Sequence, residues 1–222
     1  MATVVWSHSS LKNYEGCPRR YYEERVAKNF KFKDTQATLY GTALHKAAED
    51  YIGEDIPLPP EYAFIQGTLD ALKTKPGRKL VEHKMALTEQ LVPCDWTAPD
   101  VWVRGIADLL IVNDDNLTAR VVDYKTGNNK YPDREQLKLM SMLVFAHFPH
   151  IREVKSALLF VVKNDMVKHS MARDKVDAEW WRYRERTAKV AASMESGVWN
   201  PQQSGLCGKY CAVITCEHNG RH

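Results

Sequence analysis

Two aspartates and a lysine in neighbouring apolar segments are the residues whose types and spacing could do chemistry. Asp108 lies in the segment 101–112, and Asp123 and Lys125 close the segment 117–125. The polar residues between the segments predict a hairpin turn that places Asp108 opposite Asp123. Carboxylates facing each other across a hairpin repel, whereas a divalent cation such as Mg²⁺ between them would make the pair stable. The spacing therefore favours a metal site.

Lys125 extends this interpretation to phosphate chemistry. Side chains alternate along a strand, so Asp123 and Lys125 should share a face while Tyr124 points away. A lysine beside a metal site can stabilise the charge that develops on a phosphate. An isolated Asp-x-Lys is more often a surface ion pair at a strand end, and the position of Asp108 is what favours a functional site.

Alternating helices and strands must position these residues. Apolar residues at helical spacing predict helices, and β-branched runs predict strands. The helices are expected over about 11–27 (interrupted near Pro18), 41–52, 61–73, 134–148 and 176–196, and the strands over 79–87, 101–112, 117–124, 155–162 and 166–171. This order predicts an α/β or α+β fold with a mixed central sheet flanked by helices.

Nearly the whole chain, in order, resembles the PD-(D/E)XK nucleases, and specifically their RecB-like and Cas4-like branch. A serine-led opening at 7–22 runs into Cys-Pro and aromatic residues. The motifs that follow are Gly41-Thr-Ala-Leu-His45, Gly105-Ile-Ala-Asp108, Asp123-Tyr-Lys125-Thr-Gly127 and Gln136. Position 140 is Met, where the family usually has Tyr, and this departure bears on the role of Gln136.

The resemblance implies a restriction-endonuclease-like core and a metal-dependent DNA nuclease. His45, Asp108, Asp123 and the carbonyl of Tyr124 would bind Mg²⁺ or Mn²⁺. Lys125 would be the catalytic lysine, acting with Asp108 and Asp123, and Gln136 would orient the site or the DNA. Glu82 would lie at the edge of the pocket, and Glu49, one helical turn after His45, could orient the imidazole. Taken alone, a histidine at the edge of an apolar helix face is usually structural.

Three of the five cysteines crowd near the C-terminus, as Cys207, Cys211 and Cys216. A site with four ligands needs one more, for which Cys17 is the natural candidate and His218 the alternative. The alternatives are that these cysteines are separate buried thiols without a metal, or that they bind Zn²⁺, which accepts the same ligands as iron. The resemblance implies a [4Fe–4S] cluster on Cys17 and the three C-terminal cysteines, which would join the two ends of the chain.

Basic and aromatic residues between positions 19 and 33 are a candidate contact with nucleic acid. Arg19, Arg20 and Tyr21 belong to this segment, in which cations could bind phosphates while rings stack on unpaired bases. A solvated helix face over packed rings is the alternative for any one of these residues. The net charge of +3 is too small to decide between the two.

One nuclease domain over residues 1–222 is expected, with its core at about 36–196 and cluster-binding segments at about 7–28 and 197–222. No apolar run is long enough to span a bilayer, and the start lacks the features of a signal peptide, so a cytoplasmic protein is expected. The partner would be single-stranded DNA or duplex DNA with ends, and a homo-oligomer or a recombination or CRISPR protein could be a further partner. The leading function is exonuclease action in recombination, repair, or phage or CRISPR DNA processing. The alternatives are RNA as substrate and a non-catalytic DNA-binding or assembly module.

Overall fold

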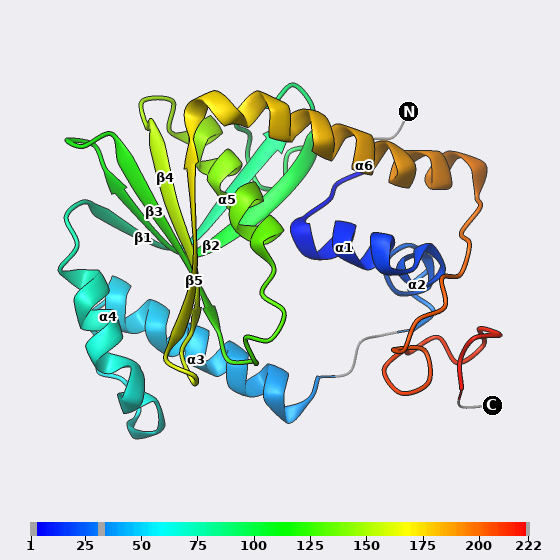
Figure 1. The fold of residues 1–222 in the computed structure, drawn as a ribbon, viewed down its shortest axis with the longest axis horizontal. Helices are drawn as coiled ribbons and strands as arrows, with labels where there is room; N and C mark the ends of the chain where they lie inside the picture. Colours follow the sequence, from blue (N-terminus) through cyan, green and yellow to red (C-terminus); the bar gives the residue numbers. More distant parts are fainter. Residues whose placement is uncertain (1–3, 31–33, 221–222) are drawn as a thin grey trace. The chain divides into compact units, whose positions relative to one another are not determined.

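The computed structural model describes residues 4–30 and 34–220 (Figure 1). Lys31, Phe32 and Lys33, at the end of the basic segment, lie outside the described residues. The chain forms two compact units. One unit runs from Asp34 to Trp180, and the other combines the N-terminal residues before it with those from Trp181 onward.

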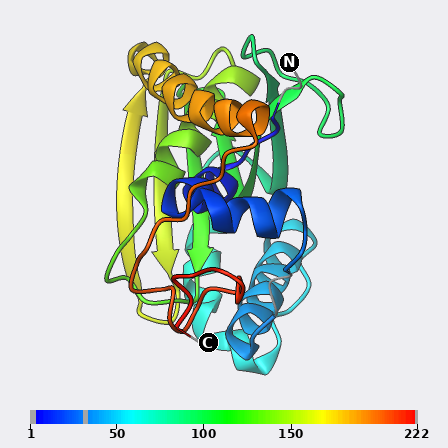
Figure 2. The same ribbon diagram turned by 90° about the vertical axis from the view of Figure 1, so that its right-hand side faces the viewer.

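The unit from Asp34 to Trp180 is built on a five-stranded mixed sheet whose spatial order follows the sequence (Figure 1). Neighbouring strands are antiparallel except β3 and β4, which are parallel. Figure 2 shows β5 (yellow) at one edge of this sheet. The strands are β1 (Arg78–Thr88), β2 (Val101–Asn113), β3 (Thr118–Lys125), β4 (Glu153–Phe160) and β5 (Asp165–Ala172).

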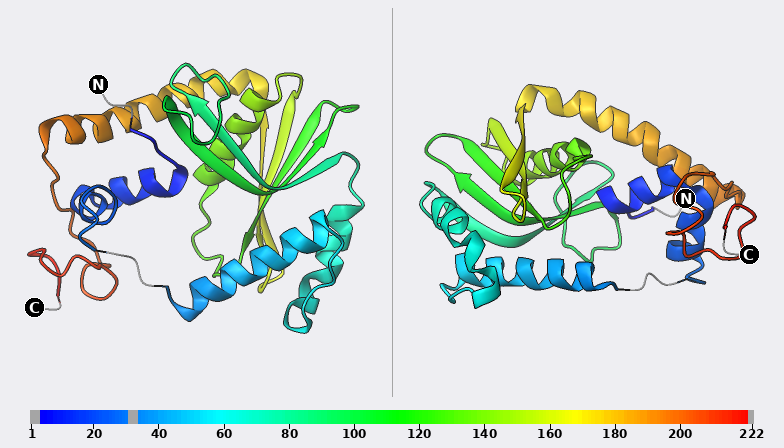
Figure 3. Two further views of the ribbon diagram at one scale, coloured as in Figure 1. Left: turned by 180° about the vertical axis from the view of Figure 1, so that it is seen from behind. Right: turned by 60° about the horizontal axis from the view of Figure 1, so that its bottom comes forward.

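Helices cover both faces of the sheet, as the right-hand view of Figure 3 shows. On one face lie α3 (Gln36–Gly53), the 3-10 helix η2 (Pro60–Ile65) and α4 (Gln66–Lys73). Their apolar side chains form a buried cluster with Leu109, Val122 and Tyr124 of the sheet. On the other face, α5 (Arg134–His147) packs Leu137 against the sheet. The predicted α/β fold with a mixed sheet between helices is confirmed, and it is consistent with a restriction-endonuclease-like core.

The predicted hairpin register is also present. Asn113 pairs with Thr118, and the ladder between β2 and β3 continues to Leu109 and Val122. Each expected helix and strand is found, because local apolar periodicity determines these elements. Their ends are shifted by a few residues. A long loop, 89–100, joins β1 to β2.

The other unit brings N-terminal and C-terminal segments together. It contains α1 (His8–Gly16), α2 (Pro18–Tyr21), the π-helical turn η1 (Tyr22–Val26) and most of α6 (Val176–Ser196), which follows the short η3 (Arg173–Lys175). Tyr14 of α1 donates a 2.8 Å hydrogen bond to the carbonyl of Lys189, and Arg186 of α6 forms a 2.6 Å ion pair with Glu15. Residues 197–220 contain no helix or strand. None of the described helices has the length and apolarity to cross a membrane.

Candidate active site

A fork between β2 and β3 places the two aspartates. Their ladder ends at Leu109 and Val122, one residue pair before Asp108 and Asp123 would meet. Beyond that point β2 pairs only with β1, and β3 only with β4. Asp108 fills the opening, because its Oδ2 accepts a 2.7 Å hydrogen bond from the backbone N–H of Tyr124. A side chain thus replaces the backbone pairing where the strands separate.

His45 reaches this fork from α3. Thr35 caps the helix N-terminus and so fixes where its first turn starts. His45 Nδ1 lies 3.3 Å from Asp108 Oδ2, and Nε2 lies 2.9 Å from the Tyr124 carbonyl oxygen. Burial lowers the pKa of His45, but the hydrogen bond and charge of Asp108, with the charge of Asp123 and the Tyr124 carbonyl, raise it overall. Both ring nitrogens therefore face acceptors.

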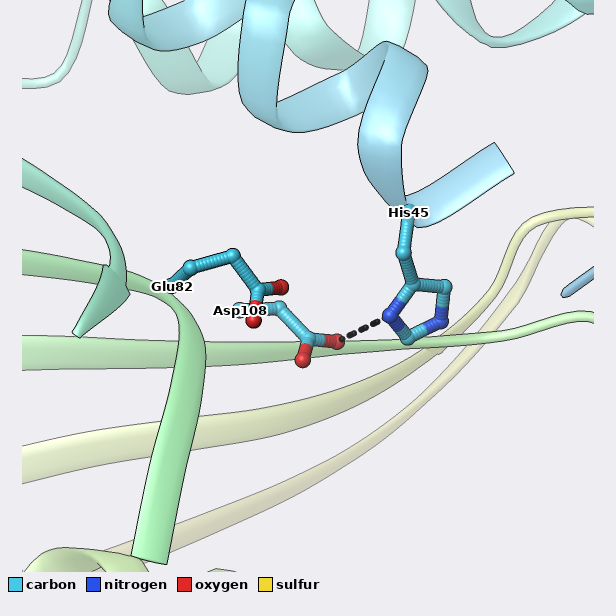
Figure 4. Close-up of side chains that lie close together, drawn as sticks. All are labelled: His45, Glu82 and Asp108. Carbon is cyan, nitrogen blue, oxygen red and sulfur yellow. Dashed lines mark ion pairs between the residues drawn. The ribbon is translucent and has the colours of Figure 1, made fainter. Parts of the chain in front are cut away.

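Glu82 completes the group, and sequence reasoning placed it only at the pocket's edge. Three ligand atoms lie within 4.8 Å of one another, one from each of His45, Glu82 and Asp108 (Figure 4). Glu82 interrupts the pairing of β1 with β2 and has a φ of 44°, a backbone conformation that is costly for a residue other than glycine. The signal in the sequence was a carboxylate that directly follows Leu80 and Val81 within the expected strand 79–87.

Asp123 and Lys125 project from the same side of β3, as the alternation predicted, while Tyr124 is buried in the opposite cluster. Lys125 Nζ lies 2.6 Å from Asp123 Oδ2, and Gln136 Nε2 of α5 donates to Asp123 Oδ1. Asp123 is 6% exposed. Burial and the charge of Asp108 raise the pKa of Asp123 to about 6, although the charges of Lys125 and His45 act in the opposite direction.

The donors around the fork fit a divalent cation. Two carboxylates and a backbone carbonyl are oxygen ligands that suit Mg²⁺ and Mn²⁺, and the imidazole adds a nitrogen ligand that is more typical of transition metals. Without a cation the carboxylates repel each other. The pKa of Glu82 is raised first by burial and then by the charge of Asp108. Asp123 is not part of the group within 4.8 Å, because it faces Lys125 and Gln136 instead. Glu49 pairs with Lys46 at 3.2 Å, and its charge acts on Glu82.

Gly105 lets α5 approach β2 closely enough to place Gln136. A Cβ built at Gly105 would lie 2.4 Å from Leu143 Cδ1 and 3.0 Å from Met140 Sδ. Met140, at the position where the resembling family usually has Tyr, is buried in this contact. The methionine therefore has a packing role, and Gln136 reaches Asp123 without a tyrosine at 140.

Four cysteines belong to the unit of the chain ends, and Cys94 belongs to the other. Cys17 Sγ accepts from the backbone N–H groups of Arg20 and Gln202, at 3.5 and 3.3 Å, and Cys207 Sγ from that of Ser204 at 3.3 Å. Among the described residues, no three cysteine sulfurs come within 4.8 Å of one another. Burial, and then the charges of Glu217, Cys17 and Cys211, raise the pKa of Cys216.

The three predicted nucleic-acid contacts have partners within their own unit. Tyr21 is 6% exposed and stacks on Trp199 at 6.0 Å between ring centroids. Arg19 pairs with Glu23 at 2.9 Å and Arg20 with Glu24 at 2.8 Å, along one helical stretch. These contacts favour a packing role for Tyr21 and leave the two arginines partly exposed.

Comparison with known proteins points to one family. The model of the PD-(D/E)XK nuclease superfamily matches residues 5–216. No curated protein matches the sequence. Among solved structures, the protein SSO0001 is similar with a TM-score of 0.51 and 16% identity, and a candidate exonuclease from Eubacterium rectale with a TM-score of 0.53 and 10% identity. Each similarity covers 97% of this chain and 87% of the other, and at these identities it shows the fold alone.

Proposed function

The chain belongs to the PD-(D/E)XK nuclease superfamily, and from that premise we propose that it hydrolyses DNA phosphodiester bonds with a divalent cation, Mg²⁺ or Mn²⁺. The observation that carries the proposal is the convergence of His45, Glu82 and Asp108 within 4.8 Å at the strand fork, where Lys125 pairs with Asp123 on the adjoining strand. We include Asp123 and the carbonyl of Tyr124 as further ligands. When bound, the cation would supply Lewis-acid stabilisation of the charge on the scissile phosphate.

The chain's own residues would organise the reaction around the phosphate. Asp108 is held in place by the Tyr124 N–H, and Asp123 by Gln136, so both carboxylates keep a fixed direction. Lys125 would place its ammonium against the phosphate oxygen that gains charge, in a partly buried site where that interaction is stronger than in water.

The unit formed by the N-terminal and C-terminal segments would bind a [4Fe–4S] cluster, with Zn²⁺ as the alternative. Support comes from Cys17, Cys207, Cys211 and Cys216, which share one unit, and from the backbone N–H groups that point at the sulfurs of Cys17 and Cys207. Such donors are a feature of thiolates that bind clusters. We assign the cluster a structural role first, because it would join segments that are about 190 residues apart in sequence.

Exonuclease action on DNA ends is our preferred activity, and the fold shared with the candidate exonuclease of E. rectale is consistent with it. The alternative is a DNA-binding or assembly module that retains the nuclease fold. Against that alternative stands the complete set of polar residues at the fork. The role would be in recombination, repair, or phage or CRISPR DNA processing in the cytoplasm, with a second copy or another protein of those pathways as partner.

The test is cleavage of end-labelled linear DNA, single-stranded and double-stranded, beside circular single-stranded DNA, in Mg²⁺, Mn²⁺ or EDTA. Asp108→Asn and Lys125→Ala should each lose more than about 100-fold in rate. Asp114→Asn is the matched control, because it removes an exposed carboxylate from the turn of the same hairpin. Degradation of linear but not circular DNA would establish an exonuclease. Binding of DNA without cleavage in any metal would instead favour the non-catalytic module.

A further inference from the structure

The loop that follows the catalytic lysine has an ordered path. Residues 126–133 connect Lys125 at the end of β3 to α5, which carries Gln136. Within the loop, Asn128 Oδ1 accepts from the N–H of Lys130 at 2.7 Å, and Asn129 donates to the carboxylate of Asp165 on β5. One hydrogen bond within the loop and one to β5 therefore hold its centre at the end of the sheet where the active-site strand β3 ends.

Tyr131 projects from this loop with 82% of its surface exposed, more than any other large hydrophobic residue described. Lys130 Nζ lies 5.3 Å from the centre of its ring. The residues that precede it in the loop, Gly127-Asn-Asn-Lys130, include no other large apolar side chain. A ring with one face free and a cation beside it can stack on a base while the cation meets the neighbouring phosphate.

The charge at this end of the sheet is suited to a nucleic-acid backbone. Lys130, Arg134 and Lys163 are all exposed. None of them forms an ion pair with another described residue. Lys163 belongs to the turn after β4, which lies next to the loop because β3 and β4 are parallel and Val161 N–H donates to the Lys125 carbonyl at 3.0 Å. Two acids share this end of the sheet, and both accept hydrogen bonds: Asp165 from Asn129, and Asp133, the N-cap of α5, from the Glu135 N–H.

The helix that carries His45 borders the same loop. A Cβ built at Gly41 would lie 3.2 Å from Thr126 Oγ1, so α3 and the start of the loop are in close contact. Gly41 precedes His45 by one helical turn. The path from the proposed metal ligand to the loop that bears Tyr131 therefore runs through directly packed residues.

We propose that Tyr131 and Lys130 bind an unpaired DNA strand next to the active site, so that the substrate class is single-stranded DNA or an end whose strands have separated. The inference rests on the proposed action on DNA. A ring that projects from a loop can stack on a base within a strand only when that base is out of the duplex, because paired bases in the interior of a duplex are already stacked on both neighbours. Lys130, Arg134 and Lys163 contact the phosphates on either side.

Binding without cleavage tests the proposal. Fluorescence anisotropy in EDTA would compare the whole protein on three probes: a thymidine 15-mer, an abasic strand with the same number of phosphates, and a blunt duplex. We expect the thymidine strand to bind most tightly, and Tyr131→Ala to weaken that binding by about 5- to 150-fold, the range of one base stack. Tyr131→Phe keeps the ring and should keep the affinity. Phe64→Ala, which removes another exposed ring of the same unit, is the matched control.

The outcomes separate this inference from the nuclease proposal. Equal affinity of Tyr131→Ala and wild type for the thymidine strand, or equal affinity of wild type for thymidine and abasic strands, overturns the inference even if the protein cleaves DNA. Binding that depends on Tyr131, together with no cleavage in Mg²⁺ or Mn²⁺, supports the inference and counts against the nuclease proposal alone.

Discussion

Glu82 is the residue at which the structure adds most to the sequence. Asp108, Asp123 and Lys125 could be predicted because a single hairpin register relates them. The contribution of Glu82 depends on a second register, between β1 and β2, and on a positive φ that turns the chain at this position. No local pattern in the sequence specifies either. Such strain is common at functional sites, where the surrounding structure compensates for it.

We expect Glu82→Gln to weaken metal binding. The change removes the negative charge and one oxygen of a carboxylate in the group within 4.8 Å, and it leaves the side chain's size almost unchanged. Isothermal titration calorimetry with Mn²⁺ should show that the affinity of the variant for Mn²⁺ is at least about 10-fold lower than that of wild type. Glu61→Gln, an exposed carboxamide exchange on η2, should leave the affinity unchanged. Equal Mn²⁺ binding by Glu82→Gln and wild type would exclude Glu82 as a ligand.

Gln136 tests how Asp123 is held. Gln136→Glu replaces a donor to Asp123 Oδ1 with a second carboxylate, so the two side chains would repel instead of bonding. The rate of DNA cleavage at saturating Mn²⁺ should fall by about 10- to 100-fold. Gln90→Glu makes the same exchange in an exposed turn and serves as the control. A Gln136→Glu enzyme as fast as wild type would mean that Gln136 only packs α5 against the sheet.

At the scale of elements, the sequence predicted what local patterns determine. The strands and helices were expected within a few residues of their observed ends, because alternating and 3.6-residue apolar periods are local properties. The fork was not predicted: from the hairpin alone, Asp108 and Asp123 should pair directly. The structure ends the ladder one pair earlier, and a hydrogen bond from Tyr124 to Asp108 replaces the pair.

The contact between α5 and β2 should be sensitive to one methyl group. Gly105→Ala would place its Cβ 2.4 Å from Leu143 Cδ1, so the helix or the side chain has to move. Overpacking of this kind lowers the free energy of unfolding by ~1–3 kcal/mol, which urea denaturation would measure. Because α5 also carries Gln136, cleavage should slow as well. Gly67→Ala meets nothing within 4 Å in α4, and there a gain of up to about 1 kcal/mol is expected. Equal stability of Gly105→Ala and wild type would contradict this packing.

At the scale of the whole molecule, the division into two units was beyond local patterns. The boundary at Trp180 and Trp181 falls inside α6, where neither Gly nor Pro marks it. The pairing of α1 with the C-terminal half of α6 likewise depends on contacts between residues about 175 apart, such as Tyr14 with Lys189. Contacts over such separations arise from packing and leave no periodic trace in either segment.

At the scale of the whole molecule, we predict that a metal bound by four cysteines holds the C-terminal segment in place. If Cys17, Cys207, Cys211 and Cys216 hold a metal cluster, Cys17→Ser should lose the metal and free residues 197–220, which contain no helix or strand to stabilise them. Limited proteolysis with mass spectrometry should then show faster cleavage in that segment.

Elemental analysis of anaerobically purified wild type should find iron with acid-labile sulfide, and zinc instead would identify the alternative site. Cys94→Ser, in the other unit, is the matched control and should retain the metal. A Cys17→Ser protein with as much metal as wild type would exclude Cys17, and His218 would become the fourth ligand to test, because it follows Cys216 by two residues.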